Sequence, residues 1–304
     1  MSEDNEAVTS SRCASCGVAE NDDIKLKNCT ACFLVKYCGI QCQKAHRKQH
    51  KRACKKRAAE LRDELLFKQP ESSHLGDCPI CMIPLSLDKS KSNIASCCSK
   101  VICKGCTFAN MKREKEMRLQ PVCPFCRKPA PKTMEENDKQ RMKRIEANDP
   151  AAMCQWAGMQ KQKGNYAIAF EYYTKAAELG DAEAHYWLAG LYHKGQQGIM
   201  MDKGKYTHHL EEAAIGGHPN ARFNLGFEED IDDNIERAMK HWIIAATQGD
   251  NDAMKALMTK FREGHVSKED LDATLRANKA AIDATISPQR EEAEKSLRNF
   301  WDDC

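Results

Sequence analysis

The sequence lacks a long apolar run, a strong excess of one charge and a secretory leader pattern. None of its apolar runs approaches the ~20 residues that a membrane-spanning helix needs. The first residues, MSEDNEAVTSS, contain neither a basic segment nor an apolar segment of the kind found in signal peptides. Lysine and arginine number 47 against 44 acidic residues, so the net charge of +3 names no partner. We expect an intracellular protein, cytoplasmic or nuclear, without a membrane partner.

Cysteine is abundant in the first part of the chain and nearly absent from the rest. Of 17 cysteines in 304 residues, 15 lie between Cys13 and Cys126, and only Cys154 and Cys304 lie outside that range. Recurring CxxC pairs without a secretory signal favour metal sites over disulfides. Neither Cys154 nor Cys304 has neighbours that suggest a covalent nucleophile.

The first cysteine cluster occupies residues 13–54, with the pattern C-x2-C-x12-C-x2-C-x5-C-x3-C-x7-H-x3-C. Its eight thiol or imidazole donors can fill two tetrahedral zinc sites. A segment of about forty residues buries too little apolar surface to fold alone, so metal would supply much of its folding free energy. His46 and His50 are rival donors on one helix. His50 lies one turn before Cys54, whereas His46 lies more than two turns before it, so His50 is the predicted ligand.

This order of donors, with Tyr37 before Cys38 and a Cys42-Gln43 pair, resembles a MYND finger. The resemblance implies binding of proline-containing peptides and two interleaved zinc sites. The implied ligand sets are Cys13, Cys16, Cys38 and Cys42 for one ion, and Cys29, Cys32, His50 and Cys54 for the other. His46 stands where the family usually has tryptophan, and we expect it to pack there. The basic run at 51–57 is expected to be a solvated helix face, with a nuclear import signal or a nucleic-acid patch as alternatives.

The second cluster occupies residues 78–126, with three CxxC pairs and one adjacent pair, Cys97-Cys98. The CPIC start and the CPFCRKP end resemble a RING-type zinc finger. The histidine that usually precedes the third pair is missing, and Lys100, which one alignment places there, is protonated at neutral pH and cannot bind metal. An all-cysteine RING subtype matches better, because four residues separate Cys98 from Cys103.

The all-cysteine resemblance implies two further zinc ions, and therefore four in the chain. The implied sets are Cys78, Cys81, Cys103 and Cys106, and Cys97, Cys98, Cys123 and Cys126. Adjacent side chains in extended backbone point to opposite faces, so a turn is needed for Cys97 and Cys98 to reach one ion.

A RING resemblance implies transfer of ubiquitin by positioning, without a covalent intermediate on the ligase. The residues that match the family's surface for the conjugating enzyme are Ile80, Pro124 and Arg127; simple loop packing is the alternative for the first two and a solvated side chain for the third. The sequence is interpreted as a zinc-binding adaptor and RING-type E3 ubiquitin ligase, with a non-catalytic scaffold as the alternative.

From about Asp149 the sequence repeats with a period of 32 to 37 residues. The segments 175–184, 212–221 and 244–253 align without gaps, and apolar residues at helical spacing predict stacked helix pairs. The pattern resembles Sel1-like repeats, relatives of the tetratricopeptide class, which recruit protein partners or substrate. Asn278, at a position where other units are apolar, predicts an exposed end of the array. Five histidines are expected to serve packing or the surface: His185, His193, His208, His209 and His241.

These patterns predict a multidomain fold of two zinc-stabilised cross-brace domains followed by an all-α solenoid. The predicted divisions are a disordered segment (1–12), a MYND-type finger (13–54), a helical linker (55–77), a RING-type finger (78–130), a helical linker (131–148), Sel1-like repeats (149–286) and a C-terminal tail (287–304).

Overall fold

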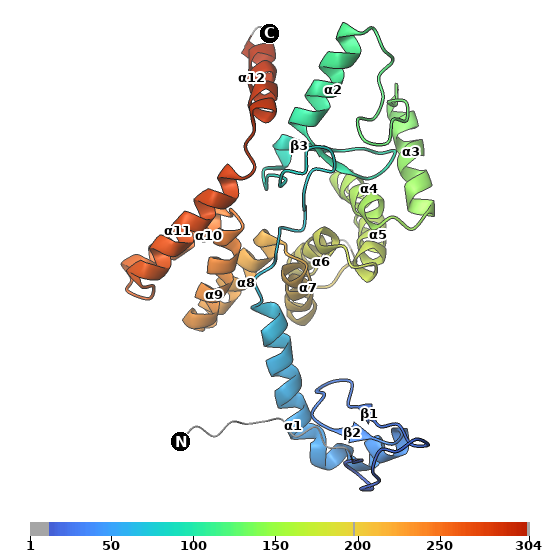
Figure 1. Ribbon diagram of the computed structural model, residues 1–304, viewed down its shortest axis with the longest axis vertical. Coiled ribbons are helices and arrows are strands. Elements are labelled where there is room, and N and C mark those ends of the chain that lie inside the picture. Colours follow the sequence, from blue (N-terminus) through green and yellow to red (C-terminus); the bar gives the residue numbers. More distant parts are fainter. Residues whose placement is uncertain (1–11, 197, 303–304) are drawn as a thin grey trace. The chain divides into compact units, whose positions relative to one another are not determined.

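The computed structural model describes residues 12–196 and 198–302. The chain divides into two compact units, Met1–Lys68 and Gln69–Cys304, and Figure 1 labels their helices. The disorder expected for residues 1–12 falls, except for Arg12, outside the described residues, and so does Cys304. Within the described part of the chain, no helix combines the length and the apolar character needed to cross a membrane.

The first unit is a small finger followed by a long helix. Strands β1 (Lys27–Asn28) and β2 (Lys36–Tyr37) pair antiparallel, and helix α1 runs from Ile40 to Leu66. Only His50 and Leu66 of α1 are buried, and the remaining buried core consists of three cysteines and Tyr37. So little apolar surface cannot hold a finger together, which agrees with a fold that depends on its sulfur and imidazole groups.

The second cysteine cluster forms a compact module at the start of the second unit. It contains a 3-10 turn η1 (Lys89–Lys91), an antiparallel pair β3 (Ser92–Ile94) and β4 (Val101–Cys103), and helix α2 (Lys104–Glu116). Its core is again mostly cysteine, supplemented by Leu85 and Ile102.

Helix α3 (Met134–Glu146) leads into an array of four helix pairs. The pairs are α4 (Pro150–Gln162) with α5 (Tyr166–Glu178), α6 (Ala182–Lys194) with α7 (Lys203–Ile215), α8 (Pro219–Ile231) with α9 (Ile235–Thr247), and α10 (Asn251–Arg262) with α11 (Lys268–Asp283). The alanine that recurs near the start of the first helix of each pair is fully buried in all four cases: Ala152, Ala184, Ala221 and Ala253. Small side chains at these positions let neighbouring backbones approach closely, which confirms the predicted helical repeats.

The expectation of an exposed polar face at Asn278 is wrong. Asn278 is buried, and its side-chain amide donates to the carbonyl of Ala246 at 2.8 Å. Ala246 lies in the last turn of α9, and its carbonyl also accepts the Gly249 amide at 2.9 Å. The polar residue therefore adds a second hydrogen bond at the end of a neighbouring helix in place of filling an apolar contact.

The segment expected only as a C-terminal tail contains helix α12 (Pro288–Asp302). This helix lies against α2 of the cysteine module, and Ala293 is fully buried there. A methyl group added at Gly105 of α2 would come within 2.9–3.0 Å of Arg290 atoms, so glycine is required for this close approach. Residues far apart in sequence thus form one wall of the module.

Candidate metal centres

The structure brings the sixteen predicted donors together as four separate sets. In each set, one donor atom from every residue lies within 4.8 Å of the others: Cys13, Cys16, Cys38 and Cys42; Cys29, Cys32, His50 and Cys54; Cys78, Cys81, Cys103 and Cys106; Cys97, Cys98, Cys123 and Cys126. The described cysteines form no disulfide. Both modules therefore have the interleaved arrangement of two crossed sites.

The spacing of the donor atoms fits zinc. Four sulfurs at tetrahedral corners, each about 2.3 Å from a zinc ion, lie about 3.8 Å from one another. The Sγ–Sγ distance is 3.8 Å for Cys29 and Cys54 and also for Cys81 and Cys103, and 3.9 Å for Cys98 and Cys123. Other pairs are closer together, down to 3.3 Å for Cys97 and Cys126. The sets would hold zinc as closed structural sites, which leave no position open for substrate.

Four of the CxxC pairs share one backbone turn. The residue after the second cysteine has a left-handed conformation in each: Gly17, Phe33, Met82 and Arg127, with φ of 74°, 58°, 55° and 61°. Its amide donates to the carbonyl of the first cysteine at 2.9–3.0 Å. This conformation is uncommon for residues with a Cβ atom, and here it folds the chain so that both thiols face one point.

The same turn explains how the adjacent cysteines Cys97 and Cys98 reach one site. Ser99 has φ of 56° and donates its amide to the Ala95 carbonyl at 2.7 Å, so Ala95 stands where the other turns have their first cysteine. Cys98 takes the place of the second cysteine, while Cys97 supplies a donor from the middle of the turn. Lys100 is exposed, in agreement with its assignment to the loop.

Backbone N–H groups lower the pKa of several thiols in these turns. Burial raises the pKa of Cys13, but hydrogen bonds from the backbone of Cys16 and Cys38 outweigh burial and lower it to about 6. The pKa of Cys78 is likewise lowered to about 7, against burial, by the backbone of Cys103 and Cys81. Because the thiolate is the form that binds metal, these hydrogen bonds favour the ligand state of Cys13 and Cys78, whereas burial raises the pKa of Cys97 and Cys106.

His50 and His46 have different roles on α1. His50 is buried, with Nε2 3.1 Å from the Cys32 sulfur. His46 stacks on His50 at 5.7 Å between ring centroids, and its Nδ1 lies 3.1 Å from the Tyr37 hydroxyl. His46 thus packs against the site from outside, as expected for the position at which MYND fingers usually have tryptophan.

Arg290 of α12 contacts the first half of the second module. Its guanidinium donates to the carbonyls of Pro84 and Ile83 at 2.7 and 3.0 Å, and lies 3.5 Å from the Cys81 sulfur. Sequence reasoning missed this contact because 209 positions separate Arg290 from Cys81. Hydrogen bonds to ligand atoms commonly hold them in the orientation that the metal needs.

Replacing Arg290 by alanine is expected to speed zinc loss from the Cys78, Cys81, Cys103 and Cys106 set by about tenfold, in line with other outer contacts of metal sites. The rate would be followed with a chromogenic chelator, and the matched control is Glu291→Ala, an exposed neighbour. A rate equal to that of the unchanged chain would show that Arg290 does not support this set.

The residues matched to the conjugating-enzyme surface lie on two different zinc turns. Ile80 is 41% exposed, Pro124 is half-buried and Arg127 is exposed. The Arg127 guanidinium donates to the Asn110 side-chain carbonyl at 3.1 Å, and the Asn110 amide donates to the Val122 carbonyl at 3.2 Å. The sequence did not single out Asn110, although an Asn110–Glu114 pair one helical turn apart was visible.

A fifth group of possible donors lies where the cysteine module meets the array: His74, Glu183 and His218. Both histidine Nε2 atoms lie 3.1 Å from the same Glu183 oxygen, and Lys89 contacts the other oxygen. His218 Nδ1 accepts the Ala221 amide at 3.3 Å as an N-terminal helix cap, so Nε2 carries the proton and donates to Glu183. The group therefore acts as a hydrogen-bonded joint, because a metal ion would have to compete with the lysine ammonium and displace this proton.

The five histidines assigned to packing or the surface do not form a metal set in the described part of the chain. His241 is buried in α9, His185 and His209 contact each other at 3.0 Å between Nδ1 atoms, and His208 is exposed. The basic run at 51–57 lies on α1, where most of its side chains are exposed and Arg57 pairs with Glu64 at 2.9 Å.

The fold and the four donor sets define a protein with a cysteine-rich zinc-finger region followed by an all-helical repeat array. Residues 13–54 match the family model of the MYND finger. Both MYND fingers and helical repeats are protein-interaction modules, so the chain has the domain organisation of an adaptor.

Several known proteins resemble parts of the chain. Chitin synthase regulatory factor 4 of Schizosaccharomyces pombe is 35% identical over 86 residues, which are 28% of this chain and only 14% of that relative's length. A protective antigen of uropathogenic Escherichia coli with an SLR fold is 21% identical, with a TM-score of 0.43 over 49% of this chain and 34% of that chain. A Sel1 repeat protein from Oxalobacter formigenes is 27% identical, with a TM-score of 0.42 over 49% of this chain and 66% of that chain.

Proposed function

We propose that the chain is a zinc-dependent adaptor whose second cysteine module is a RING-type E3 ubiquitin ligase domain. The observation that carries the proposal is the crossed pairing within residues 78–126, where the first and third cysteine pairs form one set and the second and fourth form the other. The first module shares this pairing, so the RING assignment also rests on the CPIC and CPFCRKP segments. The MYND finger and the repeat array would recruit proteins, and the module would recruit a conjugating enzyme. Its contribution to the reaction is positioning, since no nucleophile of its own is involved.

The surface for the conjugating enzyme would include Ile80 and Pro124, with Arg127 at its edge. Ile80 is an exposed apolar side chain on a turn fixed by its zinc site, which suits a contact that must be rigid before the partner arrives. The hydrogen bond from Arg127 to Asn110 would have to be exchanged if Arg127 bridges ubiquitin and the enzyme.

Autoubiquitination with a panel of conjugating enzymes tests this proposal. We expect ubiquitin chains with at least one enzyme, and at least a tenfold loss in Ile80→Ala, because apolar anchors at interface centres carry much of the binding energy. Met82→Ala is the matched control, since Met82 is an even more exposed apolar residue on the same turn. The absence of chains with every enzyme under zinc-replete conditions would reject the ligase function.

The second candidate is a scaffold without catalytic activity. The existing bond between Arg127 and Asn110 favours it, because the side chain is already engaged. The description of the Schizosaccharomyces pombe relative as a regulatory factor also favours it. Membrane contact is not part of either proposal, and the intracellular location stays a prediction.

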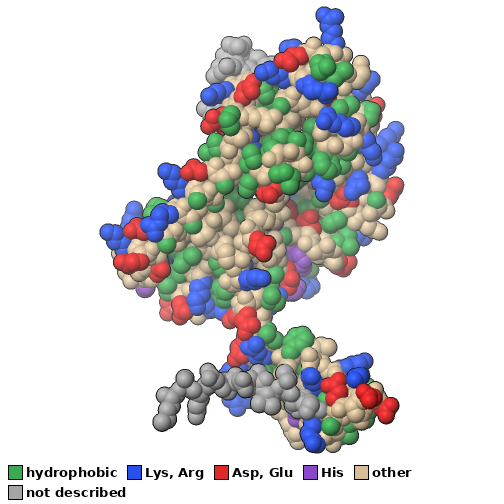
Figure 2. Space-filling view, viewed as in Figure 1, with side chains coloured by type: hydrophobic (Ala, Val, Ile, Leu, Met, Phe, Trp, Pro, Cys, Tyr) green, Lys and Arg blue, Asp and Glu red, His purple; other side chains and the backbone are tan. Residues whose placement is uncertain are grey.

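The nucleic-acid alternative concerns the basic run at 51–57, and the visible face of the repeat array adds no support for it. In the face shown in Figure 2, lysine and arginine side chains are intermingled with acidic ones over the repeat array, without a broad surface of one sign. Binding to phosphate backbones needs such a surface.

A further inference from the structure

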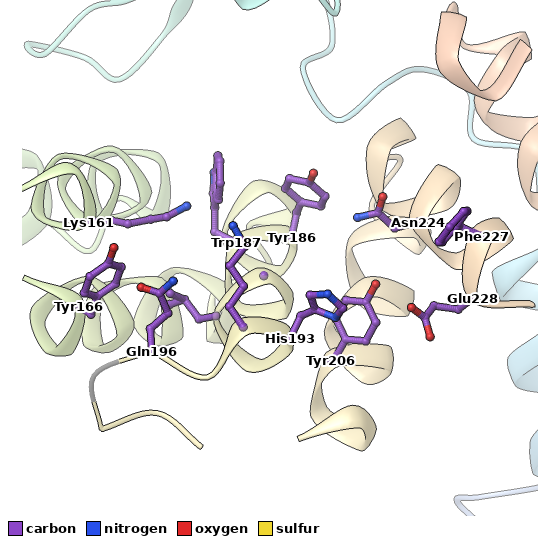
Figure 3. Close-up of a pocket in the computed structure, with 13 residues that line it drawn as sticks. Lys161, Tyr166, Tyr186, Trp187, His193, Gln196, Tyr206, Asn224, Phe227 and Glu228 are labelled. Carbon is purple, nitrogen blue, oxygen red and sulfur yellow. The ribbon is translucent and has the colours of Figure 1, made fainter. Parts of the chain in front are cut away.

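The repeat array contains a groove lined with aromatic side chains across its first three helix pairs. Its volume is about 430 Å³, and its walls include Tyr166, Tyr186, Trp187, Tyr206 and Phe227. Figure 3 shows the Tyr186 and Trp187 rings from α6 on one side and Tyr206 from α7 on the other. Phe227 is 53% exposed, so the groove offers apolar surface to solvent.

Two lysines stand at one end of this groove. The Lys161 ammonium lies 3.6 Å from the centroid of the Trp187 ring, and Lys194 also lines the groove. Among the described residues, neither lysine has a carboxylate within ion-pair distance. Figure 3 shows the Lys161 side chain directed along the groove toward Trp187.

The two ends of the groove differ in charge. Glu228 lies at the other end, where its carboxylate is 3.7 Å from the Lys203 ammonium, which also lies 3.5 Å from the Asp232 carboxylate. At the Trp187 end, burial and then the charges of Lys194 and Lys89 lower the pKa of Lys161. Glu183, which accepts the Trp187 indole N–H at 2.8 Å, opposes this lowering of the pKa only in part. An anion bound there would relieve this repulsion between like charges.

We propose that this groove binds an extended peptide segment with an acidic side chain, held between Lys161 and Lys194 at the Trp187 end. The aromatic walls would contact the neighbouring side chains of the peptide, and the lysines would fix its register. The proposal rests on the adaptor function, for which it names the class of partner. It does not depend on the ligase activity.

The test is selection of a randomised heptapeptide library displayed on phage, with the full zinc-loaded chain as bait. A Lys161→Glu/Lys194→Glu double variant serves as the counter-bait, so that peptides held by the MYND finger or other surfaces are subtracted. We expect the remaining peptides to be enriched in aspartate or glutamate. Enrichment in lysine or arginine, enrichment without charge, or no enrichment over the counter-bait would overturn the proposal.

Affinity measurements then assign the effect to single residues. For the most enriched peptide, measured by fluorescence polarisation, Lys161→Ala and Lys194→Ala should each weaken binding about tenfold, as expected for one charge-assisted contact. Lys163→Ala is the matched control, because Lys163 is exposed just beyond α4 and does not line the groove. Equal affinities in the unchanged chain and all three variants would show that the peptide binds elsewhere, and would reject the groove as its binding site.

The same proteins separate two further outcomes. A single-stranded DNA 20-mer that binds through Lys161 and Lys194 while no peptide does would show a nucleic-acid site instead. Because autoubiquitination is measured without any of these peptides, failure of the groove and failure of the ligase function are distinguishable.

Discussion

Removal of zinc is expected to unfold both cysteine modules while the helical repeats stay folded. The buried core of the first module is three cysteines and Tyr37, and that of the second is mostly cysteine, so neither has an apolar core that persists without metal. Structural zinc sites contribute about 10–16 kcal/mol of apparent binding free energy in finger peptides. The array has separate apolar cores that contain no predicted zinc ligand.

This result would be measured by limited proteolysis with mass spectrometry, before and after treatment with a strong chelator. Cleavage should appear within residues 13–54 and 78–126 and stay absent from α4 to α10. Chelator already saturated with zinc is the control, and added zinc should restore protection. Cysteine modules that resist cleavage without metal would contradict the dependence on zinc.

Trp242→Ala should lower the free energy of unfolding of the array by about 3–5 kcal/mol, the usual cost of removing a buried aromatic side chain. Trp242 is 2% exposed in α9, and its indole N–H donates to the Phe223 carbonyl at 3.2 Å. The ring lies directly against Gly226, where an added methyl group would come within 2.5 Å of it. Truncation would therefore leave a cavity between α8 and α9 and remove the indole hydrogen bond to α8.

Urea unfolding followed by circular dichroism of the zinc-loaded chain measures this difference. Phe227→Ala is the matched control, since this aromatic residue of α8 is mostly exposed and should change stability by about 0.5 kcal/mol or less. Equal effects of the two substitutions would contradict the packing described for α8 and α9.

The sequence could predict which cysteines share a site because metal binding imposes strict local spacing. Each CxxC turn is a local structure, and the interleaved order in both modules follows from family resemblance. The sequence predicts that a turn is needed at Cys97 and Cys98. It does not predict the backbone conformation of that turn. Its geometry depends on Ala95 and Ser99, which have no distinctive chemistry of their own.

Contacts between distant segments could not be predicted in the same way. Arg290 and Glu183 look like ordinary surface residues of charged helices, and their roles come from the packing of the cysteine module against the array. Asn278 breaks the apolar pattern of its helix, which suggested exposure. The missing information was that a neighbouring helix ends beside it, with a backbone carbonyl that accepts a further hydrogen bond. The apolar periodicity of a sequence describes the faces of one helix at a time. These residues contact a second segment of the chain, which periodicity does not identify.

Native mass spectrometry of the intact, zinc-loaded chain tests the central claim most directly, because it counts the ions that the four donor sets hold. We predict four zinc ions per chain, and three for Cys97→Ser, whose substitution removes one thiolate from the fourth set. A count of three that Cys97→Ser leaves unchanged would contradict the paired-cysteine site and the crossed zinc architecture of the second module.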